Sequence, residues 1–210
     1  YGFTLDSQTR EWIVRMRQGL DRVAKERIRD ELALILSAPN SASTLRFLDY
    51  DNVVEVLLPE CKPMRDLRQN DFHHRDVWNH TLDTLRVLEG VVNILSSAHD
   101  PDASGNLMLG LLSMRLGRYR EQIEKHLQTE LVTERPLRNL LFIAALYHDI
   151  AKPLTRSVEE NGRIRYFNHD EVGAEMITKR AEAFRFSNTE TERLAIIIRH
   201  HMRPSFLSHA

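Results

Sequence analysis

The sequence predicts an all-α fold with one small β-hairpin inserted near its C-terminal end. Over most of the 210 residues, apolar side chains recur at intervals of three and four. This spacing places them on one face of a helix. Asn161-Gly162 stands between two short stretches of alternating apolar residues, which is typical of a hairpin with a tight turn. Hydrophobic residues make up 42% of the chain, enough for a substantial core.

The first half of the chain is expected to be helical with one irregular stretch. Apolar residues at helical spacing from residue 13 to 37 predict a helix that Pro39 ends. One or two short helices are expected over 44–58. Pro59 and Pro63 begin an irregular stretch that runs to about residue 75, and a long helix is expected over 76–96.

The second half begins with turn composition at residues 100–106, which predicts a loop. Helices are then expected over 107–128, from Pro136 to His148, over 170–186, and from Thr189 to His201. Asn168 with Glu171, and Thr189 with Glu192, match the spacing of a capping box at the start of the last two helices.

Charge and cysteine content exclude several classes of protein. The formal net charge of −1, from 29 basic and 30 acidic side chains, excludes a uniformly basic nucleic-acid-binding surface and leaves room for a local patch. Cys61 is the single cysteine, so an internal disulfide and a cysteine-rich zinc site are excluded. This suits a reducing, cytoplasmic location. Because no apolar stretch reaches ~18 residues, we expect no membrane span.

Several of the ten histidines continue apolar stripes toward the expected core. In LYHDIAKP, residues 146–153, His148 extends the stripe of an apolar helix and Asp149 follows it. His201 extends a second stripe, His80 lies early in the long helix, and His169 precedes a helix start.

Burying imidazoles beside a carboxylate is costly unless a partner neutralises them. A divalent cation held by neutral histidines and Asp149 would do so, and this ligand type suits manganese, iron, nickel, cobalt or zinc. The alternative for each histidine is an ordinary core or surface residue with hydrogen-bond partners in the protein.

Six ordered motifs resemble the HD superfamily of metal-dependent phosphohydrolases. More closely, they resemble the HD-containing tRNA nucleotidyltransferase (CCA-adding enzyme)/poly(A) polymerase proteins. The motifs are GFTLDSQTRE (2–11), ERIRDEL (26–32), DVWNHTLDTL (76–85), ALYHDIAKP (145–153), FNHDEVGAE (167–175) and IIRHHMRP (197–204). The resemblance implies neck- and body-like helices over residues 1–65 and an HD domain over 66–210. The Gly-Ser turn with an Asp-x-Asp pair that marks the catalytic head of that family is not found, so we expect the chain to correspond to the part that follows the head.

The resemblance also implies a metal set. His80, His148 and Asp149 match the family's ligands, but no aspartate follows Asp170 to match its late aspartate. Extra histidines serve in two-metal HD proteins, and His169, His200 and His201 stand where such ligands would lie. Asp149 would then bridge two divalent ions (Mn, Ni, Fe, Co, Zn or Mg).

The implied activity is hydrolysis of nucleotide or RNA-end phosphoesters by a metal-activated water. Asp149 and Lys152 are the candidate catalytic residues, and Lys152 and Arg156 are candidates for binding phosphate. The alternative for both basic residues is solvated surface charge.

Residues 10–29 carry seven basic and three acidic side chains, which suggests an RNA-binding helix face. Its candidate contacts are Arg15, Arg22, Lys25 and Arg29. An ordinary solvated face is the alternative. Two other functions remain open: a non-catalytic RNA-binding portion of a nucleotidyltransferase in tRNA 3′-end processing, and a nucleotide-sensing regulatory module.

Overall fold

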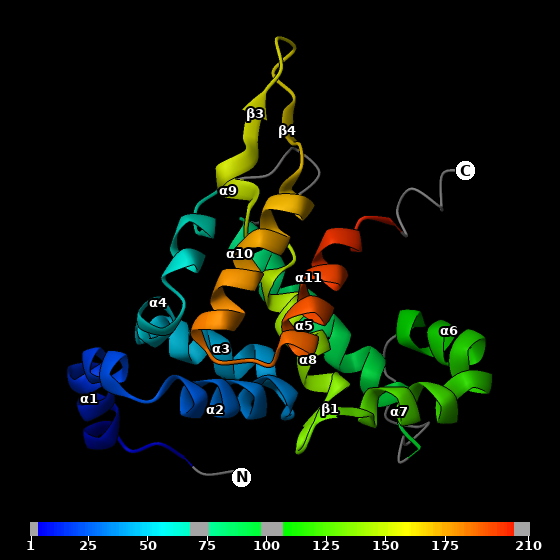
Figure 1. The fold of residues 1–210 in the computed structure, drawn as a ribbon, viewed down its shortest axis with the longest axis horizontal. Helices are drawn as coiled ribbons and strands as arrows, with labels where there is room; N and C mark the ends of the chain where they lie inside the picture. The colour runs from blue at the N-terminus through cyan, green and yellow to red at the C-terminus, as the bar shows by residue number, and fades with distance from the viewer. Residues whose placement is uncertain (1–3, 68–75, 98–106, 204–210) are drawn as a thin grey trace.

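The computed structural model describes residues 4–67, 76–97 and 107–203, and it is built mainly from helices (Figure 1). The strands in this part of the chain form two separate two-stranded antiparallel sheets. The predicted fold class is therefore confirmed, with one hairpin more than expected. The loop expected at 100–106 lies outside the described residues.

The helix expected over 13–37 is interrupted. Asp6 caps the first helix by accepting hydrogen bonds from the N–H groups of Gln8 and Thr9. None of the residues of that helix is buried, whereas the last helix of this stretch buries Ile28 and Leu32 among others. The break lets the second helix turn its apolar face to the core while the first stays at the surface. The elements here are α1 (Ser7–Met16), the 3₁₀ helix η1 (Arg17–Arg22) and α2 (Lys25–Ser37).

Three short elements lead from α2 to the long helix. They are α3 (Ser41–Tyr50), α4 (Val53–Leu57) and the 3₁₀ helix η2 (Pro59–Met64), and α5 (Val77–Ile94) follows. Two short helices were among the expected arrangements for residues 44–58. In η2, Glu60 accepts hydrogen bonds from the Tyr147 hydroxyl (2.6 Å) and from Nε of Arg180 (2.7 Å). This contact ties the N-terminal region to elements more than 80 residues away.

Helix α8 (Leu137–Tyr147) lies at the centre of the core, as its near-continuous apolar sequence requires. Its side chains are buried on nearly every side, and Phe142 and Leu146 are fully enclosed. Helices α2, α5 and α11 (Asn188–His200) pack against it. One continuous core contains Leu36 and Met64 together with Leu85 and Ile198. The core therefore crosses the domain boundary predicted near residue 65, and that boundary stays a prediction.

The helix expected over 107–128 is also broken. It consists of α6 (Leu107–Leu116), the 3₁₀ helix η4 (Gly117–Tyr119) and α7 (Arg120–Gln128). The hairpin of β1 (Glu130–Val132) and β2 (Arg135–Pro136), which the sequence did not predict, links them to α8.

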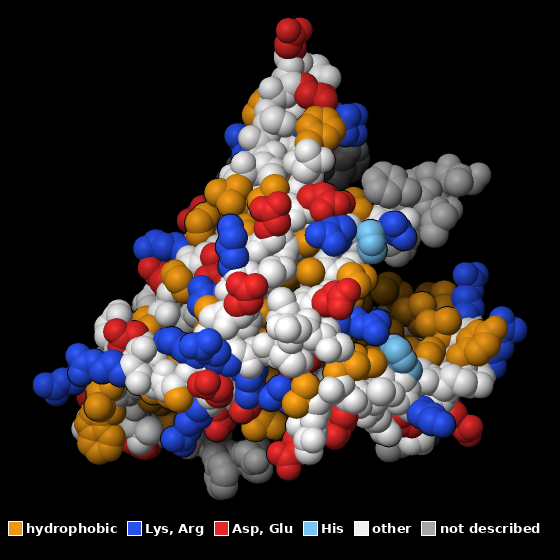
Figure 2. Space-filling model, viewed as in Figure 1, with side chains coloured by type: hydrophobic (Ala, Val, Ile, Leu, Met, Phe, Trp, Pro, Cys, Tyr) orange, Lys and Arg blue, Asp and Glu red, His pale blue; other side chains and the backbone are white. Residues whose placement is uncertain are grey.

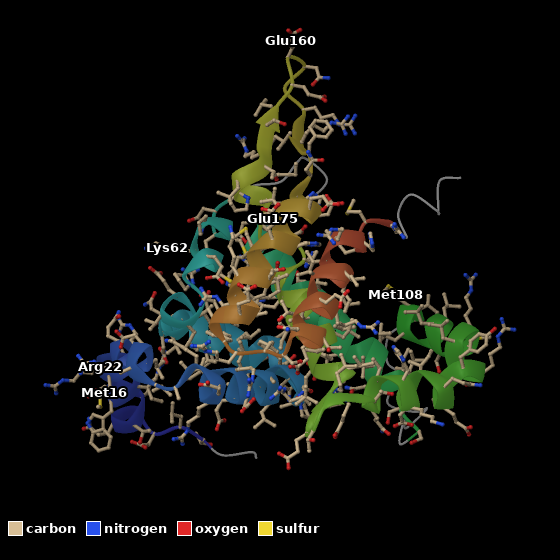
Figure 3. All side chains as sticks on the ribbon, viewed as in Figure 1. Met16, Arg22, Lys62, Met108, Glu160 and Glu175 are labelled. Carbon is tan, nitrogen blue, oxygen red and sulfur yellow. The ribbon has the colours of Figure 1, made fainter. Side chains whose placement is uncertain are left out.

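The predicted hairpin joins β3 (Arg156–Val158) to β4 (Ile164–Tyr166) and projects away from the helices (Figure 1). Figure 3 places Glu160 at its tip. The turn is wider than predicted. Glu159 N–H donates to the Arg163 carbonyl, Gly162 N–H donates to the Glu159 carbonyl, and Gly162 has φ 81°. This is a three-residue loop with glycine in the left-handed region, so the predicted hairpin is confirmed, with a loop one residue longer than the two-residue Asn-Gly type.

Both predicted capping boxes are wrong. Asn168 does precede α10 (His169–Ala183), but it has φ 60° and its side chain does not cap the helix. The box of α11 lies two residues before the predicted one, at Ser187 and Glu190. Glu190 is fully buried and also pairs with Arg135 of β2 at 2.7 Å. This long-range partner favours Glu190 over the exposed Glu192 as the capping residue.

Acidic and basic side chains are interspersed over the face that Figure 2 shows, in keeping with the near-zero net charge. Apolar side chains gather there over α6 and α7, where Leu107 and Met114 are more than 80% exposed. Within the three described stretches, no helix combines the length and the apolar character needed to cross a bilayer.

Candidate metal centre

The candidate ligands come from four elements that meet at the end of α8. His148 is the C-cap residue of α8, and Asp149 follows it at 2% exposure. His80 lies in the first turns of α5, His169 is the first residue of α10, and His201 is the C-cap residue of α11. Apolar packing of these helices fixes the positions of the imidazoles.

One oxygen of Asp149 faces three basic side chains. Oδ2 lies 3.1 Å from Nε2 of His148 and 3.6 Å from Nε2 of His80. The ammonium group of Lys152, one turn along the chain, lies 2.8 Å from the same oxygen. These contacts oppose the effect of burial on Asp149. Burial raises the pKa of its carboxyl group. His148 and Lys152 together lower this pKa by more than burial raises it, so the net pKa lies well below the ordinary value. Asp149 is therefore ionised at neutral pH.

The other oxygen of Asp149 faces two further histidines. Oδ1 lies 3.6 Å from Nε2 of His169 and 3.9 Å from Nε2 of His201. The two Nε2 atoms are 3.3 Å apart. Burial is the main cause that lowers the pKa of His201, so this ring favours the neutral form.

Three of the four imidazoles are held in one tautomer by the main chain. Nδ1 hydrogen-bonds to a carbonyl oxygen three residues earlier in each case: His148 to Ala145 (2.8 Å), His169 to Tyr166 (2.7 Å) and His201 to Ile198 (2.6 Å). Because a carbonyl only accepts, Nδ1 must carry the proton. In a neutral ring, Nε2 then carries the lone pair that a metal ion can accept, whereas in a protonated ring Nε2 donates to Asp149. Metal-binding histidines are usually oriented by such a bond from the other ring nitrogen.

This donor set needs a positive charge. With both Nδ1 atoms protonated, the 3.3 Å contact between Nε2 of His169 and Nε2 of His201, beside the ionised Asp149, is favourable only if an extra proton or a cation lies between these atoms. A divalent cation would fill that role by coordination. Among the described residues, two groups have ligand atoms within 4.8 Å of one another, and they share one residue: His80, His148 and Asp149; and Asp149, His169 and His201. The residues present therefore fit a divalent metal site, and the members of these two groups would be its ligands.

His200 lies outside both groups. Successive residues of a helix point about 100° apart, so the ring of His200 turns away where that of His201 turns inward. The second group contains two histidines where the family pattern has a late aspartate. Arg156 is exposed at the base of the hairpin, and among the described residues Lys152, not Arg156, is the basic residue of this segment that pairs with Asp149.

The predicted RNA contacts divide into two kinds. Arg15 and Arg22 are exposed, and Figure 3 shows Arg22 at the outer edge of the N-terminal region. Lys25 is half-buried and donates to the Asp21 carbonyl at 3.1 Å. Arg29 is 7% exposed, with its Nε 2.7 Å from Asp30 and another nitrogen donating to the carbonyl of Arg185. Its guanidinium group fastens α2 to the turn after α10 and is not available to a phosphate.

Sequence reasoning missed Tyr166. Its ring centroid lies 5.4 Å from Nζ of Lys152, and its carbonyl orients His169. The sequence signal for the role of its carbonyl was its position three residues before His169. Ala145 and Ile198, which hold His148 and His201 in the same way, also lie three residues before their histidines.

Comparison with known proteins agrees with this geometry. A family model described as "HD domain" matches residues 106–208. The chain contains an HD domain. A second model, described as "Probable RNA and SrmB- binding site of polymerase A", matches residues 2–65. The range matched by the HD-domain model begins after His80, but the structure places His80 beside Asp149 with the other candidate ligands.

Two similar proteins extend well beyond this chain. One is a CC-adding tRNA nucleotidyltransferase of Thermus thermophilus, 32% identical over 96% of the chain. The other is an A-adding tRNA nucleotidyltransferase of Deinococcus radiodurans, 27% identical over 95% of the chain. The chain spans 38% of the length of each relative. The resemblance to an HD domain within this family is confirmed.

Proposed function

We propose that the chain is a metal-dependent phosphohydrolase that acts on phosphoesters of nucleotides or RNA ends. The observation that carries the proposal is the convergence of four imidazole Nε2 atoms on both oxygens of a buried, ionised carboxylate. The match to the HD domain supports the same reading.

His80 and His148 would hold one divalent ion, His169 and His201 a second, and Asp149 both. Bound ions of this kind supply Lewis-acid chemistry and a nucleophilic water at neutral pH. Asp149 would supply negative charge to both ions, because His148 and Lys152 hold the pKa of its carboxyl group well below the ordinary value. Lys152, 2.8 Å from Asp149, is placed to hold a phosphoryl oxygen beside the ions.

Elemental analysis and turnover test the proposal together. Protein purified without chelator is expected to contain a transition metal, and to hydrolyse adenosine 2′,3′-cyclic phosphate or bis(p-nitrophenyl) phosphate. Asp149→Ala is expected to lose both metal and activity. His200→Ala is the matched control, because it removes a neighbouring imidazole that belongs to neither ligand group. Metal without turnover would favour a nucleotide sensor, and the absence of both would refute the proposal.

We further propose that the N-terminal region binds RNA, and specifically tRNA, as the names of the two relatives suggest. An open groove of about 910 Å³ there is lined by Arg10, Arg15, Arg17 and Tyr50, and also by Glu11 and Asp51. Arg10 pairs with Asp51 at 2.7 Å, which leaves Arg15 and Arg17 as the cations nearest to a bound strand. Tyr50 is 77% exposed and Trp12 is 56% exposed. Basic residues beside exposed aromatic rings suit single-stranded RNA, because the cations contact phosphates and the rings stack on bases. The match of residues 2–65 to an RNA-binding model supports this surface.

Affinity for tRNA at several salt concentrations tests this second function. Arg15→Glu and Arg22→Glu are each expected to weaken binding and to reduce the salt dependence of log K by about one phosphate contact. Arg199→Glu is a control with the same change of charge, on α11, where Arg199 pairs with Glu171 at 2.8 Å. Equal losses in all three variants would show only a general charge effect and would contradict the assignment of RNA binding to the N-terminal region.

A further inference from the structure

The β3–β4 hairpin projects beside the metal centre, yet it adds nothing to the core. No residue from 156 to 166 belongs to the core cluster of the described chain. A two-stranded hairpin is only marginally stable alone. Its base adjoins the centre, because the Tyr166 ring lies 5.4 Å from Nζ of Lys152 and the Tyr166 carbonyl holds His169, and this position suggests a role in binding.

The strand register defines which side of the hairpin faces the centre. Arg156 pairs with Tyr166, and Val158 pairs with Ile164. Directly opposed residues of two strands share one face, and so do residues two apart along a strand. Tyr166 is the residue that approaches Lys152, at 5.4 Å from ring centroid to Nζ. We call the face formed by Arg156, Val158, Ile164 and Tyr166 the inner face.

The inner face is apolar and aromatic, with one cation at its base. Val158 is 54% exposed, and Ile164 and Tyr166 are half-buried. Ile164 lies two residues beyond Tyr166, or about 7 Å further from the metal centre along the strand. The ribose of a nucleotide spans a gap of this order between a phosphate at the centre and a base against the strand.

The opposite face differs in chemistry. It carries Ser157 and Arg165, and Arg165 pairs with Glu159 at 3.1 Å. Its charges therefore neutralise each other within the hairpin, and it offers no apolar surface of comparable kind.

We propose that the inner face binds the base of a nucleoside phosphate, so that the metal centre prefers nucleotides to base-free phosphoesters. This inference rests on the proposed hydrolase function and assigns its substrate class. Val158, Ile164 and the Tyr166 ring pack against the base, and Arg156 contacts a further phosphate when the substrate is an oligonucleotide.

Calorimetric binding to the Mn²⁺-loaded protein tests the inference with two matched ligands, adenosine 3′-monophosphate and base-free ribose 3-phosphate. Packing of a base is expected to make the nucleotide bind roughly 5- to 100-fold more tightly. Ile164→Ser is expected to reduce this ratio at least about fivefold. Val158→Tyr, which enlarges the inner face with a good strand former, is expected to raise it. Arg165→Ser is the control from the opposite face and is expected to leave the ratio unchanged.

The inference is overturned if the wild type binds both ligands equally, or if Ile164→Ser and Arg165→Ser have the same effect. Turnover of adenosine 2′,3′-cyclic phosphate separates the two proposals. Turnover without a base preference refutes only the inner face. A base preference that Ile164→Ser abolishes, without any turnover, refutes only the hydrolase.

Discussion

Replacement of Asp149 by alanine should abolish the stabilisation of the protein by divalent metal. Asp149 is the residue that both ligand groups share, so one substitution removes a ligand from each. The measured quantity is the difference in melting temperature between metal-loaded and chelated protein. Because each variant is compared with itself, the cost of losing a buried carboxylate cancels.

The expected size follows from mass action. A single ion at one hundred times its dissociation constant raises the free energy of unfolding by about 2.7 kcal/mol. For a chain of this length, that corresponds to a rise in melting temperature of roughly 5–10 °C. If Asp149→Ala weakens binding about a hundredfold, the gain falls to about 0.4 kcal/mol, or a rise of roughly 1 °C.

Differential scanning calorimetry with and without EDTA measures this difference in melting temperature. Two further variants test how the difference depends on single histidines. His201→Ala removes a ligand from one group only and should retain an intermediate shift. His200→Ala should retain the full shift, because its ring belongs to neither group. A full shift in Asp149→Ala, or its loss in His200→Ala, would refute the assignment of these ligands.

Four other predictions concern the fold and are checked by chemical denaturation, titration or thiol labelling. Glu190→Gln should destabilise the protein by about 2–3 kcal/mol, because it breaks the pair with Arg135, which is 17% exposed. Burial raises the pKa of Glu190, but Arg135 and Ser187 lower it to a net value below the ordinary 4.5. The stabilisation is therefore present above about pH 4.5 and is lost as the pH falls through the lower folded value, so the wild type should lose more stability in acid than Glu190→Gln. Phe142→Ala should cost about 3–5 kcal/mol, because the ring is fully buried and leaves a cavity. Gly162→Ala should cost about 1 kcal/mol through backbone strain at φ 81°, with no steric clash. Cys61 is fully buried, and burial raises the pKa of its thiol, so alkylation in the native state should be no faster than global unfolding.

Much of the candidate metal centre was predictable because helical periodicity gives the direction of a side chain. His148 and His201 each continue an apolar stripe, so both point into the core, and the neighbouring Asp149 follows. The same periodicity separates His201 from His200, although the doublet alone does not show which ring turns inward.

Features that depend on distant partners were not predictable from local patterns. Ser187 caps α11 instead of Thr189 because Glu190 meets Arg135, 55 residues earlier in the chain. Arg29 looked like part of a basic surface, yet it binds a carbonyl 156 residues away. The three-residue loop of the β3–β4 hairpin escaped prediction for a different reason, since Asn-Gly also occurs in wider turns.

Glu60 bears on any attempt to transplant the HD domain into another protein. Its carboxylate lies 2.7 Å from Nε of Arg180, whose helix begins with His169, and 2.6 Å from the hydroxyl of Tyr147, which precedes His148. A graft that starts at residue 66 would omit Glu60. The guanidinium group of Arg180 and the hydroxyl group of Tyr147 would then lose this hydrogen-bond partner. A transplant beginning at α2 would bring the carboxylate along, and would be the safer donor piece for chimeric enzymes.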